Sequence, residues 1–200
     1  GYIGENQLAS ATRFNNPFHA LEDPISGDYM VADYSNVRLR RLQVSDNKSE
    51  LIAGNGGQRA ATNAGQGLVE AGQEKMSAVR GFAYDSVTGE LYMADSGNNR
   101  IRVLNRYGQV SQGVGTGTSG TGTEEDEYPT SATMSSPRGL VLTHKTASFG
   151  GNLVWADAGN HRIRIWNRSA ANATLFGVLV SAGKVATIGG DGTAGTATSG

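Results

Sequence analysis

Hydrophobic and polar residues follow one pattern that occurs three times along the chain. In each copy, an aliphatic or aromatic stretch ends at Ala-Asp and is followed by a short turn containing Ser, Gly or Asn. The next stretch alternates Arg with Ile, Leu or Val. The copies lie at residues 30–40, 91–104 and 154–166. Alternation with a period of two residues is typical of a β-strand, and the turn residues favour a tight reversal. The pattern therefore predicts three pairs of antiparallel strands.

The three copies are a true internal repeat. An aspartate (Asp33, Asp95, Asp157) and an arginine (Arg38, Arg100, Arg162) each recur at a constant spacing of 62 residues. Apolar segments precede each pair of strands at 18–21, 82–84 and 140–142, and others follow at 51–53, 110–114 and 185–188. No stretch has a sustained helical period. We therefore expect an all-β chain with four strands in each unit.

The repeat predicts the architecture as well as the class. A single four-stranded sheet cannot bury both of its faces, and repeated sheets bury them by stacking radially as the blades of a β-propeller. We expect one propeller segment over residues 1–200, with blades at about 14–56, 76–117 and 134–192. Gly/Thr-rich connections at 54–72 and 113–133 join them, and they account for much of the glycine, 29 of 200 residues.

The repeat core, Ala-Asp-x-Gly-Asn-x-Arg-Ile-Arg, resembles the NHL repeat. In the third unit it is preceded by Pro-Arg-Gly-Leu at residues 137–140, and Asn160-His161 matches the residues that give the family its name. The resemblance covers all three units. It implies a β-propeller, commonly with six blades, so that these three would be half of a ring. It also implies the functions of that family, which include non-enzymatic binding and sensor domains, RNA-binding regulators, and relatives of a few lyases and lactone-type hydrolases.

Three blades cannot close a ring, and an open arc leaves two sheet faces exposed. Two arrangements satisfy this constraint. Two copies can assemble head to tail into a six-bladed ring, or the chain can be a segment of a longer protein. The chain starts and stops within the same kind of Gly/Thr connection that joins its blades, which is compatible with either arrangement.

Composition narrows the classes of function. Lys and Arg total 17 against 18 Asp and Glu, which gives a formal net charge of −1. This balance argues against a nucleic-acid partner, because such proteins carry a basic surface. The absence of cysteine excludes disulfides, thiolate-bound zinc and thiol catalysis. The longest apolar run, at 175–180, is too short for a membrane helix.

His19 and Glu22 depart from the repeat, and together with Arg80 and Arg138 they are the candidate ligand-binding residues. They belong to the innermost strands, which border the central channel of a propeller. His19 could act as a base or a metal ligand, or be an ordinary residue of the channel wall. No Ser-His-Asp order or phosphate-binding loop is present, so we assign no catalytic residue and no metal ligand.

The repeated aspartates and arginines are interpreted as structural. An aspartate at a strand end, five residues before an arginine, suits a turn and an ion pair between blades, although a ring of carboxylates could also bind a metal. The arginines of the third strands are expected to be buried and paired rather than to form a basic stripe. His161 is expected to be structural, and His144, in an insertion at 143–152, to be exposed.

Two further features, an acidic run and three glycosylation sequons, are weaker indications of function. The acidic run Glu124–Glu127 is expected to be a solvated loop, with weak Ca²⁺ binding as the alternative. Sequons at Asn47, Asn167 and Asn172 would be used only in a eukaryotic secreted protein. The first two fall in predicted turns between the third and fourth strands, where a sugar could be accommodated.

The sequence therefore favours a binding or scaffold module without a cofactor, extracellular or on the cell surface, with a role such as adhesion. Its partner would be a protein or a glycan, and a homo-oligomer or further blades would complete the ring. The first alternative is a propeller hydrolase or lyase that uses His19 and Glu22 with a metal in the channel. The second is a self-assembling structural or fibre protein.

Overall fold

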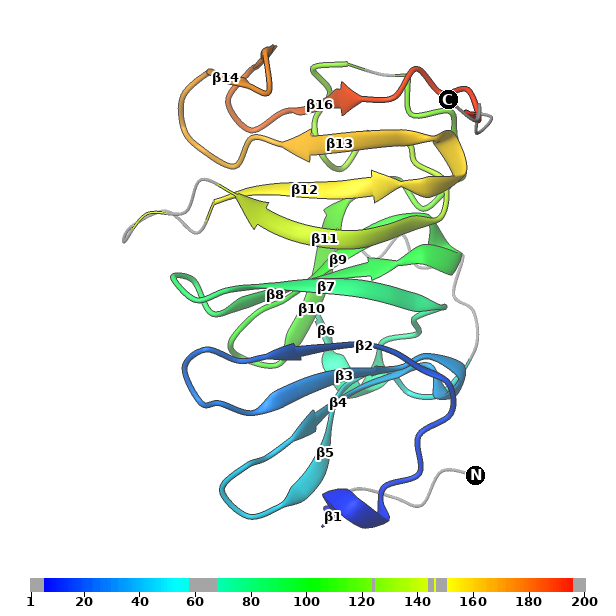
Figure 1. The fold of residues 1–200 in the computed structure, drawn as a ribbon, viewed down its shortest axis with the longest axis vertical. Helices are drawn as coiled ribbons and strands as arrows, with labels where there is room; N and C mark the ends of the chain where they lie inside the picture. The colour runs from blue at the N-terminus through cyan, green and yellow to red at the C-terminus, as the bar shows by residue number, and fades with distance from the viewer. Residues whose placement is uncertain (1–5, 58–67, 124, 144–145, 147–150, 196–200) are drawn as a thin grey trace, which may run out of the picture.

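The structure, a computed structural model, describes residues 6–57, 68–123, 125–143, 146 and 151–195. Its strands form three larger antiparallel sheets, which follow one another along the longest axis of the molecule (Figure 1), and one two-stranded sheet. In these ranges the helical segments are 3₁₀ turns of three residues. The structure thus confirms the all-β class and the three-blade arrangement, which is half of a β-propeller.

Each blade contains four strands that succeed one another in the chain. Blade 1 consists of β2 (Pro17–Glu22), β3 (Tyr29–Asp33), β4 (Arg38–Leu42) and β5 (Lys48–Ala53). Blade 2 consists of β7 (Val79–Asp85), β8 (Glu90–Asp95), β9 (Arg100–Leu104) and β10 (Gln109–Val114). Blade 3 consists of β11 (Pro137–Thr143), β12 (Asn152–Asp157), β13 (Arg162–Trp166) and β16 (Val185–Gly189).

The first two sheets each have a fifth strand, which the sequence analysis did not predict. β1 (Gln7–Leu8) pairs with β5, and β6 (Val69–Glu70) pairs with β10. In blade 3 the same place is taken by a single bridge between Glu127 and Val185. The fourth strand would otherwise be an edge with unpaired N–H and C=O groups, and the incoming connection satisfies some of them.

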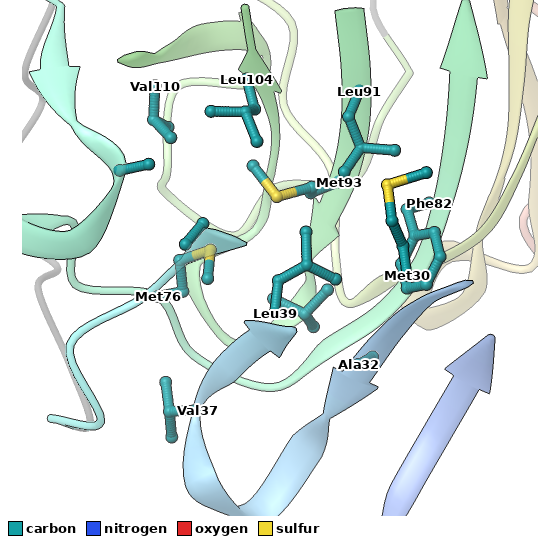
Figure 2. Packing of buried hydrophobic residues seen from close by; sticks show 13 residues of the cluster. Met30, Ala32, Val37, Leu39, Met76, Phe82, Leu91, Met93, Leu104 and Val110 are labelled. Carbon is teal, nitrogen blue, oxygen red and sulfur yellow. The ribbon is translucent and has the colours of Figure 1, made fainter. Parts of the chain in front are cut away.

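Alternate residues of the second strands face opposite neighbouring blades. Met30 and Ala32 of β3 belong to one buried cluster with Leu91 and Met93 of β8 (Figure 2). Tyr92 and Ala94 of β8 point the other way, into a cluster with Leu153 and Trp155 of β12. The core therefore lies between the sheets, as the radial stacking of blades requires.

The far face of blade 3 carries a hairpin that the sequence pattern did not predict. It consists of β14 (Ala173–Leu175) and β15 (Val178–Val180), inserted between β13 and β16. Leu175 and Val180 pack with Val154 and Ile165 in a third buried cluster. The hairpin thus covers part of the face that points away from blade 2.

The turn between the second and third strands has one conformation in all blades. A 3₁₀ turn (η2 Tyr34–Asn36, η4 Ser96–Asn98, η5 Ala158–Asn160) is followed by a residue in the left-handed region. That residue is Val37, Asn99 or His161, with φ of 51°, 50° and 54°. His161 therefore occupies a position in the turn, consistent with a structural role.

None of the helical segments in the described ranges is long and apolar enough to cross a membrane.

Candidate functional site

The innermost strands of the three blades, β2, β7 and β11, line a hollow of about 250 Å³. Its apolar wall includes Leu21, Phe82, Leu140 and Leu142. The polar side chains on its surface are His19, Glu22 and Tyr84. The hollow lies where the inner strands of neighbouring blades face one another, which is the channel side of a propeller.

His19 is held by an aromatic contact between blades. Its ring stacks on the ring of Phe82 from β7, with centroids 4.4 Å apart and an angle of 17° between the planes. Burial lowers the pKa of His19 below its ordinary value of 6.5. The imidazole is therefore neutral at pH 7, with one nitrogen able to donate a hydrogen bond and the other to accept one.

Glu22 and Tyr84 are the other polar groups of the hollow. Glu22 is exposed at the end of β2, and Tyr84 is partly buried near the end of β7. Burial raises the pKa of Tyr84, and the negative charge of Asp23 adds to the effect. The hollow therefore combines an apolar wall with a neutral imidazole, a protonated phenol and a carboxyl group.

The other two candidates, Arg80 and Arg138, are not among the residues that line the hollow. Arg80 donates hydrogen bonds from its guanidinium to the Tyr34 hydroxyl at 2.8 Å and to Ser136 Oγ at 3.4 Å. It also lies over the Tyr34 ring, 5.4 Å from the centroid. Arg138 is exposed near the start of β11. The structure thus brings His19 and Glu22 together in one hollow and leaves both arginines outside it.

The strands β7 and β11 approach each other closely beside the hollow. A Cβ atom added to Gly81 would lie 2.9 Å from the backbone nitrogen of Gly139. Only glycine allows this separation of the two strands. His19 stands in β2 at the position that Gly81 has in β7, and its imidazole lies against Phe82 of the next blade.

The repeated aspartates are fully buried and accept hydrogen bonds from the turns that follow them. One carboxylate oxygen of each accepts a backbone N–H, at 2.7–2.8 Å, from Asn15, Ser77 or Ser135. Each also accepts from the turn asparagine three residues on: Asn36, Asn98 or Asn160. Burial raises the pKa of Asp95 to about 6 and raises that of Asp157. These contacts tie each second strand to the start of its own blade.

The predicted ion-pair partner of these aspartates was wrong. The ion pairs join each aspartate to the arginine seven residues on, in the same blade: Arg40–Asp33 at 3.0 Å, Arg102–Asp95 at 3.6 Å and Arg164–Asp157 at 4.0 Å. Residues seven apart are diagonal neighbours on one face of the hairpin, within reach of a long arginine side chain.

The arginines five residues on donate hydrogen bonds to backbone carbonyls. Arg38 donates to Asn55 O at 3.3 Å, Arg100 to Asn98 O at 3.3 Å and Arg162 to Asp191 O at 3.1 Å. Burial was predicted correctly for Arg40, Arg100, Arg102 and Arg164, each at most 1% exposed.

Arg168 makes an inter-blade contact that the sequence analysis missed. Its guanidinium, just after β13, donates to Asp85 Oδ2 of blade 2 at 2.7 Å and lies 4.7 Å from the centroid of the Tyr92 ring. The Asp85 side chain is fully buried and that of Arg168 is 10% exposed. The two residues are 83 positions apart, so no local pattern could have linked them.

The acidic run is bound to blade 3 where the structure describes it. Glu124 lies outside the described residues. Glu125 Oε2 accepts the backbone N–H of Thr187 at 2.7 Å, and Asp126 Oδ1 accepts that of Ser181 at 3.3 Å. Both side chains are exposed, but the segment is attached to the outer strand rather than free in solvent.

The accessible turn predicted around Asn167 was wrong. Asn167 is fully buried, and its amide donates to the carbonyls of Ala171 at 2.9 Å and Val180 at 3.0 Å. Asn47 and Asn172 are exposed. His144 lies outside the described residues.

Within the described part of the chain, no three His, Cys, Asp or Glu side chains are grouped so that they could hold a metal ion.

No family model matches the chain, and no curated protein matches its sequence.

Solved structures do resemble this one. An auxiliary nutrient binding protein from Bacteroides thetaiotaomicron VPI-5482 matches with a TM-score of 0.58 at 19% identity, over 74% of this chain and 36% of that chain. An auxiliary nutrient binding protein from Bacteroides ovatus ATCC 8483 matches with a TM-score of 0.52 at 17% identity, over the same shares, 74% and 36%. This chain thus spans about a third of the length of the structures that it matches. These structures are β-propellers, and the likeness establishes that the chain has a β-propeller fold.

Proposed function

We propose that this chain is a propeller-type binding module whose ligand contacts the hollow between the inner strands, and that the ligand is a glycan. The observation that carries the proposal is the combination of an apolar wall with His19, Glu22 and Tyr84 in one hollow. Sugars present an apolar C–H face together with hydroxyl groups that donate and accept hydrogen bonds. A neutral imidazole, a phenol and a carboxylate beside an apolar wall complement both features.

The size of the hollow limits what it can hold. At about 250 Å³ it is slightly smaller than the roughly 300–1,000 Å³ of most small-molecule sites. It therefore suits one ring of a longer chain rather than a complete drug-sized ligand. The nutrient-binding description of two structures with the same fold also supports a binding role.

We further propose that the repeats are NHL repeats, on the motif around Asp157 and Arg162, and that the module acts outside the cell or at its surface.

A glycan array followed by calorimetry tests the proposal. We expect Glu22→Gln to weaken the binding of a glycan found on the array by at least about tenfold, because a hydrogen bond to a charged group contributes about 1.5–3 kcal/mol. Glu70→Gln is the matched control, since Glu70 is exposed on β6 at the outer edge of blade 2. The proposal is contradicted if no glycan binds, or if both variants lose the same affinity.

The second candidate is a hydrolase or lyase, and it is favoured by the placement of His19 and Glu22 in the same hollow. It would require a metal ion there. Elemental analysis of the purified protein distinguishes the two candidates, because one tightly held Zn²⁺ or Ca²⁺ per chain that is lost in Glu22→Gln would support the enzyme.

Weak Ca²⁺ binding at Glu125 and Asp126 is a separate proposal. It predicts a higher Tm in millimolar Ca²⁺, which the double variant Glu125→Gln/Asp126→Asn would abolish.

A further inference from the structure

Arg80 and Arg138, which lie outside the hollow, occupy equivalent positions on neighbouring blades. Each directly follows the residue that pairs with the repeated aspartate of its own blade. Phe18 holds the same position in blade 1. The inner strands β2, β7 and β11 lie side by side (Figure 1), so these three residues together form a rim at the start of the channel wall. The hollow with Glu22 and Tyr84 lies toward the other end of the same strands.

The backbone at the rim is irregular in all three blades. The register between the first and second strands shifts at this point in each blade. The residues two positions before the rim residues all have a positive φ: Asn16 at 52°, Ala78 at 56° and Ser136 at 49°. A β-bulge redirects a side chain, and bulges are frequent next to functional sites. The rim residues therefore depart from the regular alternation of an inner strand.

The guanidinium of Arg80 is held by neutral groups of both neighbouring blades. It donates to the Tyr34 hydroxyl and to Ser136 Oγ, and it lies over the Tyr34 ring. Phe18 packs against the same ring, with centroids 5.8 Å apart. None of the carboxylates in the described ranges forms an ion pair with Arg80. Its positive charge is thus fixed in position but not neutralised.

Arg138 supplies a second positive charge at the rim. Its side chain is exposed, and no acidic residue of the described part of the chain pairs with it. The residues that follow the two arginines are Gly81 and Gly139, where β7 and β11 approach most closely, at 2.9 Å from an added Cβ to the backbone nitrogen. The side chains of Arg80 and Arg138 therefore start from adjacent points of the channel wall.

Two sets of carboxylates could offset these charges, and neither does so. The repeated aspartates are buried and already form ion pairs with arginines of the third strands. Glu22 is four residues beyond Phe18 in β2, which is about 13 Å along an extended strand. This separation exceeds the screening length of about 8 Å at physiological ionic strength. The rim therefore keeps an excess of positive charge.

A second cavity, of about 240 Å³, lies beside Tyr34 at the junction of blades 1 and 2. This Tyr34 pocket is lined by Tyr34, Ser35, Val37, Ser77 and Ala78. At the junction of blades 2 and 3, Asn99 Oδ1 accepts the N–H of Ser136 at 2.9 Å. Val37 stands at the position of Asn99 and has no side-chain oxygen, so the N–H of Ala78 has no counterpart of this bond. The first junction thus leaves polar groups beside the rim that the second junction uses internally.

We propose that the rim binds an acidic sugar, whose carboxylate or sulfate contacts Arg80 and Arg138 while the apolar C–H face of its ring lies against Phe18. A guanidinium suits an oxyanion, because its planar fork donates two parallel hydrogen bonds. Phe18 is 52% exposed and offers an open aromatic surface. Hydroxyl groups of the sugar can reach the Tyr34 pocket. The inference rests on the proposed function and specifies its glycan as acidic rather than neutral.

Calorimetry with three oligomers built on galactose tests the need for charge. The probes are a neutral galactan oligosaccharide, an oligogalacturonate of the same length and a sulfated galactan oligosaccharide of the same length. We expect at least one of the two anionic probes to bind about tenfold or more tightly than the neutral one, because hydrogen bonds to charged groups are stronger. Its affinity should fall as the salt concentration rises. Which anionic probe binds distinguishes a carboxylate from a sulfate ligand.

Two variants locate the binding on the rim. Arg138→Gln should weaken the anionic probe at least about tenfold without changing Tm, since Arg138 is exposed. Arg80→Gln should weaken it at least as much, with circular dichroism to check the fold, because Arg80 also contacts Tyr34. Arg106→Gln is the matched control and should bind normally. It removes the same charge from an exposed turn after β9, at the opposite end of the strands from the rim.

The outcomes separate this inference from the proposed function. Equal binding of neutral and anionic probes, binding of neither anionic probe, or unchanged affinity in Arg138→Gln overturns the acidic-sugar site. A neutral glycan that binds through Glu22 alone keeps the proposed function and overturns only this inference. The absence of any bound glycan on the array overturns both.

Discussion

Arg168 offers a direct test of how the blades hold together. Its guanidinium joins blade 3 to the fully buried carboxylate of Asp85 in blade 2, at 2.7 Å. Replacing one partner of a buried ion pair typically costs about 3–5 kcal/mol, because the other charge is left without compensation. In Arg168→Ala, the backbone N–H groups of Val87 and Thr88 would still donate to Asp85, at 2.9 and 3.3 Å. We therefore expect a loss near the lower limit, about 3 kcal/mol.

The cation–π contact with Tyr92 adds to this loss. A guanidinium over an aromatic ring contributes about 0.5–1 kcal/mol at partly exposed sites, so the total is between about 3 and 4 kcal/mol. For a domain of this size each kcal/mol lowers Tm by about 2–4 °C. Arg168→Ala is thus expected to lower Tm by about 10 °C. Urea denaturation followed by far-ultraviolet circular dichroism at pH 7 measures the free energy of unfolding directly.

Acid pH gives a second readout of the same contact. Burial alone would raise the pKa of Asp85, but the hydrogen bonds from Arg168, Val87 and Thr88 outweigh it and lower the pKa below its ordinary value of 3.8. A carboxylate with a lowered pKa stabilises the fold above that ordinary value, and this contribution is lost as the pH falls. The difference between the unmodified chain and Arg168→Ala should therefore shrink below about pH 4.

Arg106→Ala is the control for this experiment. Arg106 also lies over an aromatic ring, that of Tyr107 at 5.0 Å, but both residues are exposed at the turn after β9. Its removal should change the free energy of unfolding by less than about 0.5 kcal/mol. A loss below about 1 kcal/mol for Arg168→Ala at pH 7 would refute the reasoning that the buried pair holds the two blades together.

Three further outcomes are expected. Gly81→Ala should lower the free energy of unfolding by about 1–3 kcal/mol, measured in urea, because the new methyl group meets the backbone of Gly139. The folded pKa of His19 lies below 6.5, so the unfolded chain binds more protons and stability should fall as the pH drops below that value. Urea titrations from pH 7 to 5 should show a smaller fall in the free energy of unfolding for His19→Asn than for the unmodified chain. Asn167→Asp should cost about 3 kcal/mol by thermal unfolding, because it places a carboxylate against the carbonyls that Asn167 now binds.

Much of the fold could be predicted because its signals are local. The spacing of Asp33, Asp95 and Asp157 revealed the repeat, and the alternation after each aspartate located the third strands. His19 and Glu22 could be placed on the channel side because they belong to an innermost strand. Each of these inferences depends on residues within one blade, where neighbours in the sequence are neighbours in the sheet.

The missed features depend on segments that meet only after the blades have formed. β1 and β6 are two residues long and follow no apolar pattern, so their pairing with the outer strands had no signal in the sequence. Arg168 and Asp85 belong to different blades, and each alone is an ordinary charged residue. The strand register places Arg38, Arg100 and Arg162 directly opposite the aspartates, so only the side-chain positions in the structure show that Arg40, Arg102 and Arg164 form the ion pairs.

The sequence by itself determined the all-β class and the three-blade arrangement, because the alternation of apolar and polar side chains that marks a strand depends only on the order of the residues. The tertiary structure alone decided which arginines pair with the buried aspartates, which glycines allow neighbouring strands to approach, and which charged residues join one blade to the next. The last two of these properties arise from contacts between residues tens of positions apart. Such contacts depend on how neighbouring sheets stack, and hydrophobic burial between those sheets determines the stacking.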